Sequence, residues 1–276
     1  MMSRTSDGFT DLHSHLVPGV DDGSRTLDDA RDGLRKMVQA GVRRLATTPH
    51  LDGSLTRDPG LLGPRLQEID DGFQALSELA REEFPELTVH RGQEVMLDIP
   101  DPDLSDPRIH LAETPYVLVE WPGLRVPPST EPVLARLVEA GIRPILAHPE
   151  RYHGMDKETR LAGQWREAGA ILQVNYGSIL GRYGDLPRKR ALVLLERGWA
   201  DLMASDFHGR PHLSPSLTEA REVLRELGGG PQFGLLAGLN PSRILRGEDP
   251  IPVPSLTLKP GVWQRIREVF HTRERR

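Results

Sequence analysis

Short runs of apolar and β-branched residues recur along the chain, and longer segments of helical period separate them. Each run has the length and composition typical of a strand. We therefore predict strands at 8–13, 42–48, 87–95, 116–121, 143–148, 170–175 and 201–206.

The segment 26–41 illustrates the helical pattern between these runs. Its apolar residues fall on one stripe, and acidic residues come early and basic residues late, as the helix dipole prefers. Thr26 is expected to cap the helix and Gly41 to end it. Similar patterns predict helices within 64–84, 131–141, 187–198 and 214–230, whereas 232–250 carries no clear pattern.

The alternation of strands and helices predicts an α/β fold with parallel strands and right-handed crossovers. Seven strand–helix units within about 230 residues favour a closed or nearly closed barrel over two domains. An open doubly wound sheet is the alternative, but it would want a Gly-rich turn after the first strand, and none is present. We predict a single domain over 1–250 and a C-terminal tail over 251–276.

Residues able to bind a metal ion follow most of the predicted strands. His13 and His15 form an HxH pair, which directs both imidazoles to one face of a strand. In a parallel barrel the carboxyl ends of the strands meet at one rim, so these side chains are expected to gather there. The candidates are His13, His15, Asp21, Asp22, His50, Glu94, Glu120, His148, Asp206 and His208.

Each candidate alone has a simpler explanation. A single histidine at a strand end is usually a hydrogen-bonded structural residue, and an acid there is usually a cap or a solvated charge. What favours a metal site is the coincidence, because five of the ten histidines fall on this one rim. His90, His110, His153, His212 and His271 are left with the structural explanation.

The composition narrows the chemistry further. The chain has 276 residues and no cysteine, which excludes disulfide scaffolds, thiolate zinc sites and every enzyme with a cysteine nucleophile. Its 35 basic and 40 acidic residues give a net charge of −5, which argues against unspecific nucleic-acid binding. No secretory segment or membrane span is predicted, so we expect a cytoplasmic protein.

Six sequence blocks appear together in this chain: DLHSHLVPGVDDGS, ATTPH, GQEV, VEW, AHPERY and ASDFH. In this order they resemble the polymerase-and-histidinol-phosphatase (PHP) superfamily. The first block, with AHPERY and QVNYGSILGRYG, is similar to its bacterial protein-tyrosine phosphatase branch, which regulates capsule and exopolysaccharide synthesis. The resemblance runs from about residue 10 to about 248.

The resemblance implies a distorted seven-stranded barrel with a trinuclear metal cluster. It assigns His13, His15, Glu94 and Asp206 to the first metal. Glu94 as a bridge, Glu120 and His148 are assigned to the second, and Asp22, His50 and His208 to the third. It also selects Asp22 over Asp21.

This donor set lacks thiolate and suits manganese, iron or zinc, and Mn²⁺ is what the resemblance implies. A metal-bridging hydroxide is expected to attack phosphorus in line, without a phosphoenzyme. Arg151, three residues after His148, is expected to bind the phosphate, with pairing to Glu150 or Asp156 as the alternative. Arg210 is a second candidate, although its spacing from His208 is shorter than the resemblance implies.

We therefore expect a metal-dependent phosphatase acting on phosphotyrosine in proteins, with a bacterial tyrosine autokinase of polysaccharide export as partner. A phosphatase of histidinol phosphate or a nucleotide phosphoester is one alternative. A metal-free module that binds a phosphorylated partner is another. In the loop after 170–175, Asn175 and Ser178 accompany glycines that permit close approach to a ligand, and Asp11 is expected to support ligands rather than bind metal.

The segment 260–276 predicts a basic amphipathic helix. We expect it to pack on the barrel with solvated arginines, while contact with an anionic membrane, an acidic partner or a neighbouring subunit stays open.

Overall fold

The computed structural model describes residues 8–257. All strand pairs within this range are parallel, as predicted. The strands are β1 (Phe9–Asp11), β2 (Val42–Thr47), β3 (His50–Asp52), β4 (Thr88–Arg91), β5 (Glu94–Met96), β6 (Tyr116–Glu120), β7 (Arg143–Ala147), β8 (Ile171–Asn175) and β9 (Leu202–Ala204).

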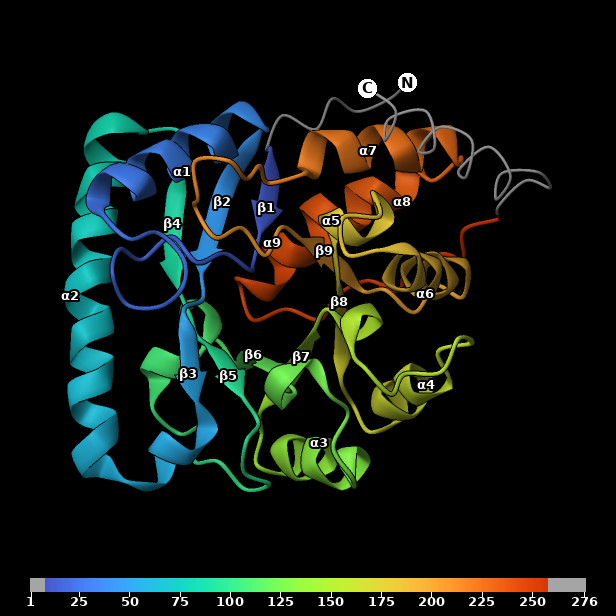
Figure 1. Cartoon of the computed structure of the whole chain (residues 1–276), viewed down its shortest axis with the longest axis horizontal. Helices are drawn as coiled ribbons and strands as arrows, with labels where there is room; N and C mark the ends of the chain where they lie inside the picture. Colours follow the sequence, from blue (N-terminus) through green and yellow to red (C-terminus); the bar gives the residue numbers. More distant parts are fainter. Residues whose placement is uncertain (1–7, 258–276) are drawn as a thin grey trace.

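Helices surround these strands in Figure 1. They are α1 (Leu27–Gln39), α2 (Pro59–Glu83), α3 (Thr130–Glu139), α4 (Arg160–Glu167), α5 (Tyr176–Ile179), α6 (Asp185–Glu196), α7 (Leu217–Glu226), α8 (Gly230–Gly234) and α9 (Asn240–Ile244). Short 3₁₀ turns lie at Gly53–Arg57, Pro107–Ile109, Leu111–Glu113, Pro122–Leu124 and Pro149–Arg151, and a π-helical turn spans Leu235–Leu239.

The prediction of seven strands is wrong in two places: β3 lies beyond the predicted run 42–48 and was not predicted, and the run 87–95 is divided in two. The run 42–48 continues as β3 after Pro49, which has no N–H group to offer the ladder. The run 87–95 breaks at Gly92, where Leu111 packs so closely that a Cβ would lie 2.6 Å from its Cδ2. These breaks give two sheets, with orders β1-β2-β4 and β3-β5-β6-β7-β8-β9.

The first and last strands are joined just past their carboxyl ends. The His15 N–H donates to the Phe207 carbonyl at 2.9 Å, and the Asp206 N–H donates to the His13 carbonyl at 2.9 Å. The Asp11 carboxylate adds a bond from the Ser205 N–H at 3.0 Å. These bonds bring the two chain segments of the predicted rim together, and the α/β prediction is confirmed.

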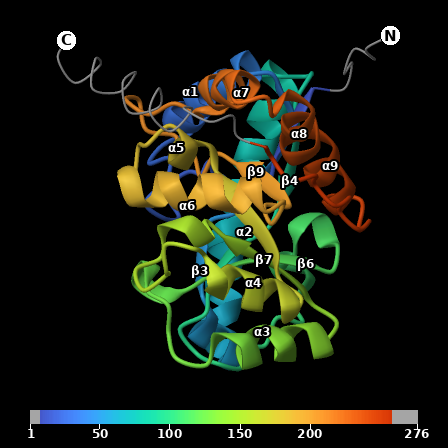
Figure 2. The same cartoon turned by 90° about the vertical axis from the view of Figure 1, so that its right-hand side faces the viewer.

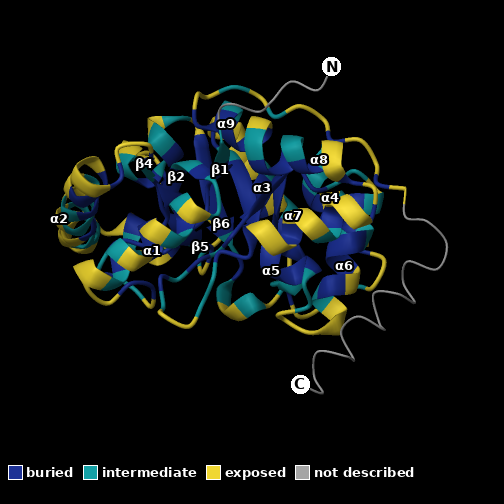
Figure 3. Ribbon diagram, turned by 90° about the horizontal axis from the view of Figure 1, so that it is seen from above, coloured by how far each residue is buried: buried dark blue, intermediate teal, exposed yellow. Residues whose placement is uncertain are grey.

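Most strand residues are buried, with the edge strand β4 as an exception, and the helices expose their outer faces, as the colouring of Figure 3 shows. In α1, Ala30, Leu34 and Met37 are buried, and the Thr26 hydroxyl accepts a hydrogen bond from the Asp29 N–H at 3.1 Å, which confirms the predicted cap. Figure 2 shows α3 and α4 beside each other, next to β7 and β8.

The segment 232–250, which the sequence pattern left unassigned, packs against β1 and β9. Leu236, Ala237 and Ile244 are buried, and the π-helical turn contacts both β1 and β9. Beyond this segment, Leu256 is buried and its N–H donates to the Leu195 carbonyl at 3.0 Å. The basic helix predicted at 260–276 lies outside the described residues. Within 8–257, no helix has the length and apolar character needed to cross a membrane.

Candidate metal centre

All nine predicted ligands lie together at one rim, where most follow a strand and His50 and Glu94 begin β3 and β5, just after β2 and β4. Their donor atoms form four overlapping groups, and within each group these atoms lie within 4.8 Å of one another. The groups are His15, Asp22, His50 and His208; His13, His15 and Glu94; His13, His148 and Asp206; and His50, Glu94 and Glu120.

Glu94 is at the centre of this arrangement and is almost fully buried. Its Oε2 lies 3.1 Å from Nε2 of His13, 3.3 Å from Nε2 of His15 and 3.2 Å from Nδ1 of His50. Its other oxygen, Oε1, lies 3.2 Å from Nε2 of His148. One carboxylate therefore faces four imidazoles, a geometry suited to a bridging ligand.

The outer nitrogen of three histidines is held by a fixed partner. Nδ1 of His13 lies 2.9 Å from Oε1 of Gln173, and Nδ1 of His15 lies 2.7 Å from Oδ2 of Asp21. Nδ1 of His208 lies 3.0 Å from the Asp206 carbonyl. Because each of these partners is an acceptor, Nδ1 carries a hydrogen, and Nε2 is the atom that would bind a cation in the cluster.

Glu120 and Asp22 complete opposite parts of the cluster. Oε1 of Glu120 lies 3.4 Å from Nδ1 of His50, and its Oε2 lies 3.8 Å from His148. Oδ1 of Asp22 lies 3.3 Å from Nε2 of His208 and 3.5 Å from Nε2 of His50. Asp22 is 66% exposed, so this edge of the cluster opens to solvent.

The two adjacent aspartates have different roles in the structure. Asp21 turns inward to His15 and also accepts from the Gly23 N–H at 2.9 Å, whereas Asp22 faces the cluster. Burial raises the pKa of Asp21, but the hydrogen bond and charge of His15 outweigh burial and bring it down to about 2. Asp21 thus supports a ligand, and the choice of Asp22 as the ligand agrees with this geometry.

The cluster strongly perturbs its own protonation. Burial lowers the pKa of His13, but the charges of Glu94 and Asp206 more than offset it, and the pKa rises to about 9. Burial raises the pKa of Glu94, yet the charge of His13 and its hydrogen bonds hold it well below the usual range. Glu94 is therefore ionised, and a cation would replace the proton that His13 otherwise takes up.

Two candidate ligands have unusual backbone conformations. His148 has φ 37° and Asp206 has φ 51°, both in the left-handed region that residues with a Cβ seldom adopt. Such strain persists where the surrounding structure imposes it, and it is concentrated at functional sites. Here it turns the side chains at the ends of β7 and β9 into the cluster.

The donor set fits divalent metal ions. It offers imidazole nitrogens and carboxylate oxygens without thiolate, which suits manganese, iron or zinc. Four carboxylates supply negative charge, and the supporting partners of His13, His15 and His208 fix the direction of their lone pairs.

Arg151 lies at the rim of the cluster, but with a partner that the sequence did not indicate. Its Nη1 lies 2.5 Å from Oδ2 of Asp206, and its guanidinium carbon lies 4.2 Å from the ring centre of Tyr183. Glu150 is instead fully buried and accepts from the Asn175 N–H at 3.0 Å and from the Ser178 hydroxyl at 2.5 Å. The expected alternative of a pair with Glu150 or Asp156 is not observed.

Arg210 bonds to the loop that carries Asp22. Its Nε and Nη2 both donate to the Asp22 carbonyl, at 3.1 and 2.5 Å. The guanidinium therefore lies beside the exposed edge of the cluster. Asp11 accepts from the N–H groups of His13 and Ser205, as expected of a supporting residue, and burial raises its pKa to about 7.

One supporting residue, Gln173, escaped the sequence analysis. Gln173 lies inside β8 and Asn175 at its end, and Nε2 of Gln173 donates to Oδ1 of Asn175 at 2.8 Å. Asn175 in turn donates to Oδ2 of Asp206 at 2.8 Å. The available signal was a polar side chain, Gln173, in the middle of an apolar strand, where burial demands a partner.

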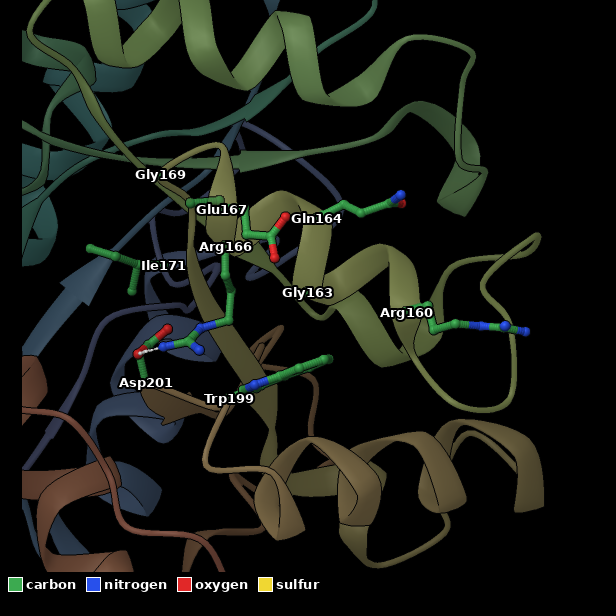
Figure 4. Close-up of a pocket in the computed structure, with 10 residues that line it drawn as sticks. Arg160, Gly163, Gln164, Arg166, Glu167, Gly169, Ile171, Trp199 and Asp201 are labelled. Atoms are coloured by element: carbon green, nitrogen blue, oxygen red, sulfur yellow. Dashed lines mark hydrogen bonds and ion pairs between the residues drawn. The ribbon is translucent and has the colours of Figure 1, made fainter.

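A separate cleft of about 480 Å³ lies at the other end of the strands. Figure 4 shows Arg166 reaching Asp201 within it, with Trp199 alongside. Ile171 and Asp201, which line it, stand at the amino ends of β8 and β9. None of the nine candidate ligands lines this cleft.

Comparison with known proteins identifies the family. Residues 9–246 match the family described as "Capsular polysaccharide synthesis, CpsB/CapC". The chain belongs to the CpsB/CapC family. The tyrosine-protein phosphatase YwqE of Bacillus subtilis is 29% identical over 219 residues, which cover 78% of this chain and 84% of YwqE. The tyrosine-protein phosphatase CpsB of Streptococcus pneumoniae is 26% identical over 249 residues, which cover 85% of this chain and 97% of CpsB.

Solved structures agree with this membership. One is a crystal structure from a study of YwqE and CpsB, described as "unique metal-dependent tyrosine phosphatases". Its TM-score is 0.73 and its sequence identity 27%, and the match covers 91% of this chain and 99% of the chain in that structure. The phosphotriesterase homology protein of Escherichia coli shares the fold alone, with 15% identity and a TM-score of 0.53. That match covers 88% of this chain and 100% of the Escherichia coli chain. The predicted family and fold class are confirmed.

Proposed function

We propose that this chain is a metal-dependent phosphoric monoester hydrolase that removes phosphate from phosphotyrosine in proteins. The observation that carries the proposal is the convergence of nine nitrogen and oxygen ligands, with Arg151 at their rim, in a member of the CpsB/CapC family. Relatives named tyrosine-protein phosphatases support the substrate class.

The ligands are proposed to hold three divalent cations, with Mn²⁺ expected and iron or zinc as alternatives. His13, His15, Glu94 and Asp206 hold the first. Glu94 is shared with the second, which Glu120 and His148 complete, and Asp22, His50 and His208 hold the third. When bound, such ions supply a hydroxide near neutral pH and neutralise charge on phosphoryl oxygens.

The protein's own groups orient the substrate. Arg151 presents a planar guanidinium beside Asp206, which suits two parallel hydrogen bonds to phosphoryl oxygens. Arg210 is the second candidate for this role, because it lies at the exposed Asp22 edge through which substrate would enter. No covalent phosphoenzyme is needed, since the attacking group is water-derived.

The chemistry of the leaving group is consistent with this site. A tyrosine phosphoester releases a phenol with a pKa of about 10, which leaves with less general-acid assistance than an aliphatic alcohol requires. The exposed edge at Asp22 suits a substrate presented on a protein tail. We propose a bacterial tyrosine kinase of polysaccharide synthesis or export as the source of that tail, and a cytoplasmic location.

Phosphate release from p-nitrophenyl phosphate and a phosphotyrosine peptide tests the proposal, measured with Mn²⁺ and with EDTA. Phosphoserine peptide and histidinol phosphate serve as substrate controls. We expect hydrolysis of the phosphotyrosine peptide that EDTA abolishes and that thiol alkylation leaves intact.

Activity that survives both EDTA and the His13→Ala substitution would contradict the mechanism. A preference for histidinol phosphate of about tenfold or more would contradict the substrate. Purified protein with almost no bound metal, measured by mass spectrometry, would instead favour a module that binds a phosphorylated partner.

A further inference from the structure

The loop that follows β8 builds one wall beside Arg151. Tyr183, at the end of this loop, places its ring 4.2 Å from the guanidinium carbon of Arg151, although 37% of Tyr183 stays exposed. On its other side the guanidinium reaches Oδ2 of Asp206. Arg151 is therefore held between an aromatic ring and a carboxylate.

The backbone of the loop fixes the position of this ring. The Gly181 and Arg182 N–H groups donate to the carbonyls of Ser178 and Gly177, both at 3.0 Å, and the chain turns back over α5. Gly181 (φ 78°) and Gly184 (φ 94°) provide the left-handed conformations that this turn requires. The loop thus returns Tyr183 to the start of α5.

Gly177 makes room for the ring. A Cβ at this position would lie 3.0 Å from Cε2 and 3.3 Å from Oη of Tyr183, so the ring lies almost directly on the glycine backbone. Asn175, two residues before Gly177, donates to Oδ2 of Asp206 at 2.8 Å. The ring, the glycine and the asparagine form one support for the Arg151–Asp206 pair.

The neighbouring Glu150 ties the same loop to the segment that carries Arg151. Its Oε1 accepts from the Asn175 N–H and the Ser178 hydroxyl, while Arg190 from α6 donates to its carbonyl at 3.4 Å. Both the backbone and the side chain of Arg151 are thus supported by residues 175–183.

The two carboxylate oxygens of Asp206 contact different groups, which indicates why support of Arg151 is useful. Its Oδ1 faces His13 and His15, at 3.4 and 3.6 Å, and its Oδ2 faces Arg151 and Asn175. Arg151 alone would be drawn toward this buried carboxylate and its neighbours. A ring stacked on the guanidinium contacts only its face and leaves its in-plane N–H groups available to an anion.

We propose that Tyr183 is a positioning residue, which sets the plane of the Arg151 guanidinium so that its free edge receives a phosphoryl group. This inference rests on the proposed function, and it assigns a task to the NYGSILGRYG segment. Tyr183 acts through Arg151 and is not itself a phosphate ligand.

The test is a double-mutant cycle on the full chain loaded with Mn²⁺, using Tyr183→Leu, Arg151→Gln and the pair together. Binding of inorganic phosphate by calorimetry is measured beside kcat and KM for the phosphotyrosine peptide, and bound metal is quantified for each variant. Tyr183→Phe separates the ring from the hydroxyl. Leu186→Ala, an exposed apolar change three residues on in α6, is the matched control.

We expect Tyr183→Leu to weaken phosphate binding and raise KM by about tenfold, the scale of one partly buried cation–π contact, with bound metal unchanged. Tyr183→Phe and Leu186→Ala are expected to stay within about threefold of the wild type. In the Arg151→Gln background, Tyr183→Leu should change phosphate binding by less than about twofold.

Additive effects of the two substitutions would overturn the proposal, and so would a loss in Tyr183→Phe as large as in Tyr183→Leu. Wild-type protein without phosphotyrosine hydrolysis would overturn the proposed function instead. In that event the phosphate-binding cycle still decides whether Tyr183 and Arg151 are coupled.

Discussion

Asp201 and Asp206 flank the same strand, β9, and both are largely buried, yet their environments differ in kind. Asp201, at the amino end, lies 3.3 Å from Arg166 and accepts from the Leu172 N–H at 2.9 Å, and burial raises its pKa. At the carboxyl end burial also acts on Asp206, but the charge of His13 and the hydrogen bond of His15 outweigh it and lower the pKa.

The difference teaches how to find the functional end of this barrel. The cleft at the amino end is a real cavity, but its buried acid is already paired with an arginine. At the carboxyl end, carboxylates and imidazoles converge with Arg151 as the one arginine bonded to a candidate ligand side chain in 8–257. The convergence of many titratable groups, rather than cavity size, distinguishes the site.

The largest expected effect comes from making the same substitution, glutamate to glutamine, at the two ends of the strands. Glu94→Gln removes the charge of the carboxylate that faces four imidazoles, while Glu167→Gln makes that change beside the cleft. Cation binding contributes several kcal/mol to such a reaction, so we expect Glu94→Gln to lower kcat/KM by roughly 10³-fold. Peptide hydrolysis and metal content are the measurements.

Glu167→Gln is expected to match the wild type in both measurements. If Glu94→Gln kept its metal and its activity, the distinction drawn between the two ends would be wrong. Equal losses in both variants would have the same meaning.

A smaller effect is expected at the residues that orient the ligands. Asp21→Asn weakens the partner of His15 Nδ1 without touching a donor atom of the cluster. Loss of such a partner typically costs 10–100-fold in metal affinity or activity. Titration with Mn²⁺ should show this drop. A variant indistinguishable from wild type would show that His15 needs no fixed partner.

The smallest effect concerns the amino end and is a matter of stability. Burial raises the pKa of Asp201 above the value of 3.8 that applies to the unfolded chain. The folded state therefore holds the carboxyl proton of Asp201 more tightly than the unfolded chain does. Its contribution to the free energy of unfolding is therefore full at lower pH and declines as the pH rises through the raised value.

Asp201→Asn abolishes that decline. We expect the variant to gain stability relative to the wild type from pH 4 upward, with peptide hydrolysis unchanged. Urea unfolding at several pH values in EDTA measures the difference. A difference in unfolding free energy between the two proteins that does not change with pH would contradict this view of Asp201, and so would a loss of peptide hydrolysis in the variant.

The sequence was sufficient to predict most of the strands and the convergence of the candidate ligands, for one physical reason. Carboxyl ends of parallel strands meet at one rim, so a histidine or acid that follows several strands, such as His50, Glu120 or His148, must lie near the others. Position along the chain therefore predicts position in space at this rim.

The remaining features depend on contacts between distant segments. Arg151 pairs with Asp206, 55 residues away, rather than with the nearby Glu150 or Asp156, and local sequence carries no sign of this. The break at Gly92 arises from packing of Leu111, and the short helix α5 from the turn that returns Tyr183 to Gly177. Propensity and period do not encode such pairings.

The order of the ligands along the chain has a consequence for biosynthesis. His13 and His15 precede the other candidate ligands along the chain, whereas Asp206 and His208 follow β9, the last strand within 8–257. A nascent chain therefore carries half-built binding groups until nearly the whole barrel has emerged. Under the proposed function, the metal site would therefore be completed only after Asp206 and His208 have been synthesised.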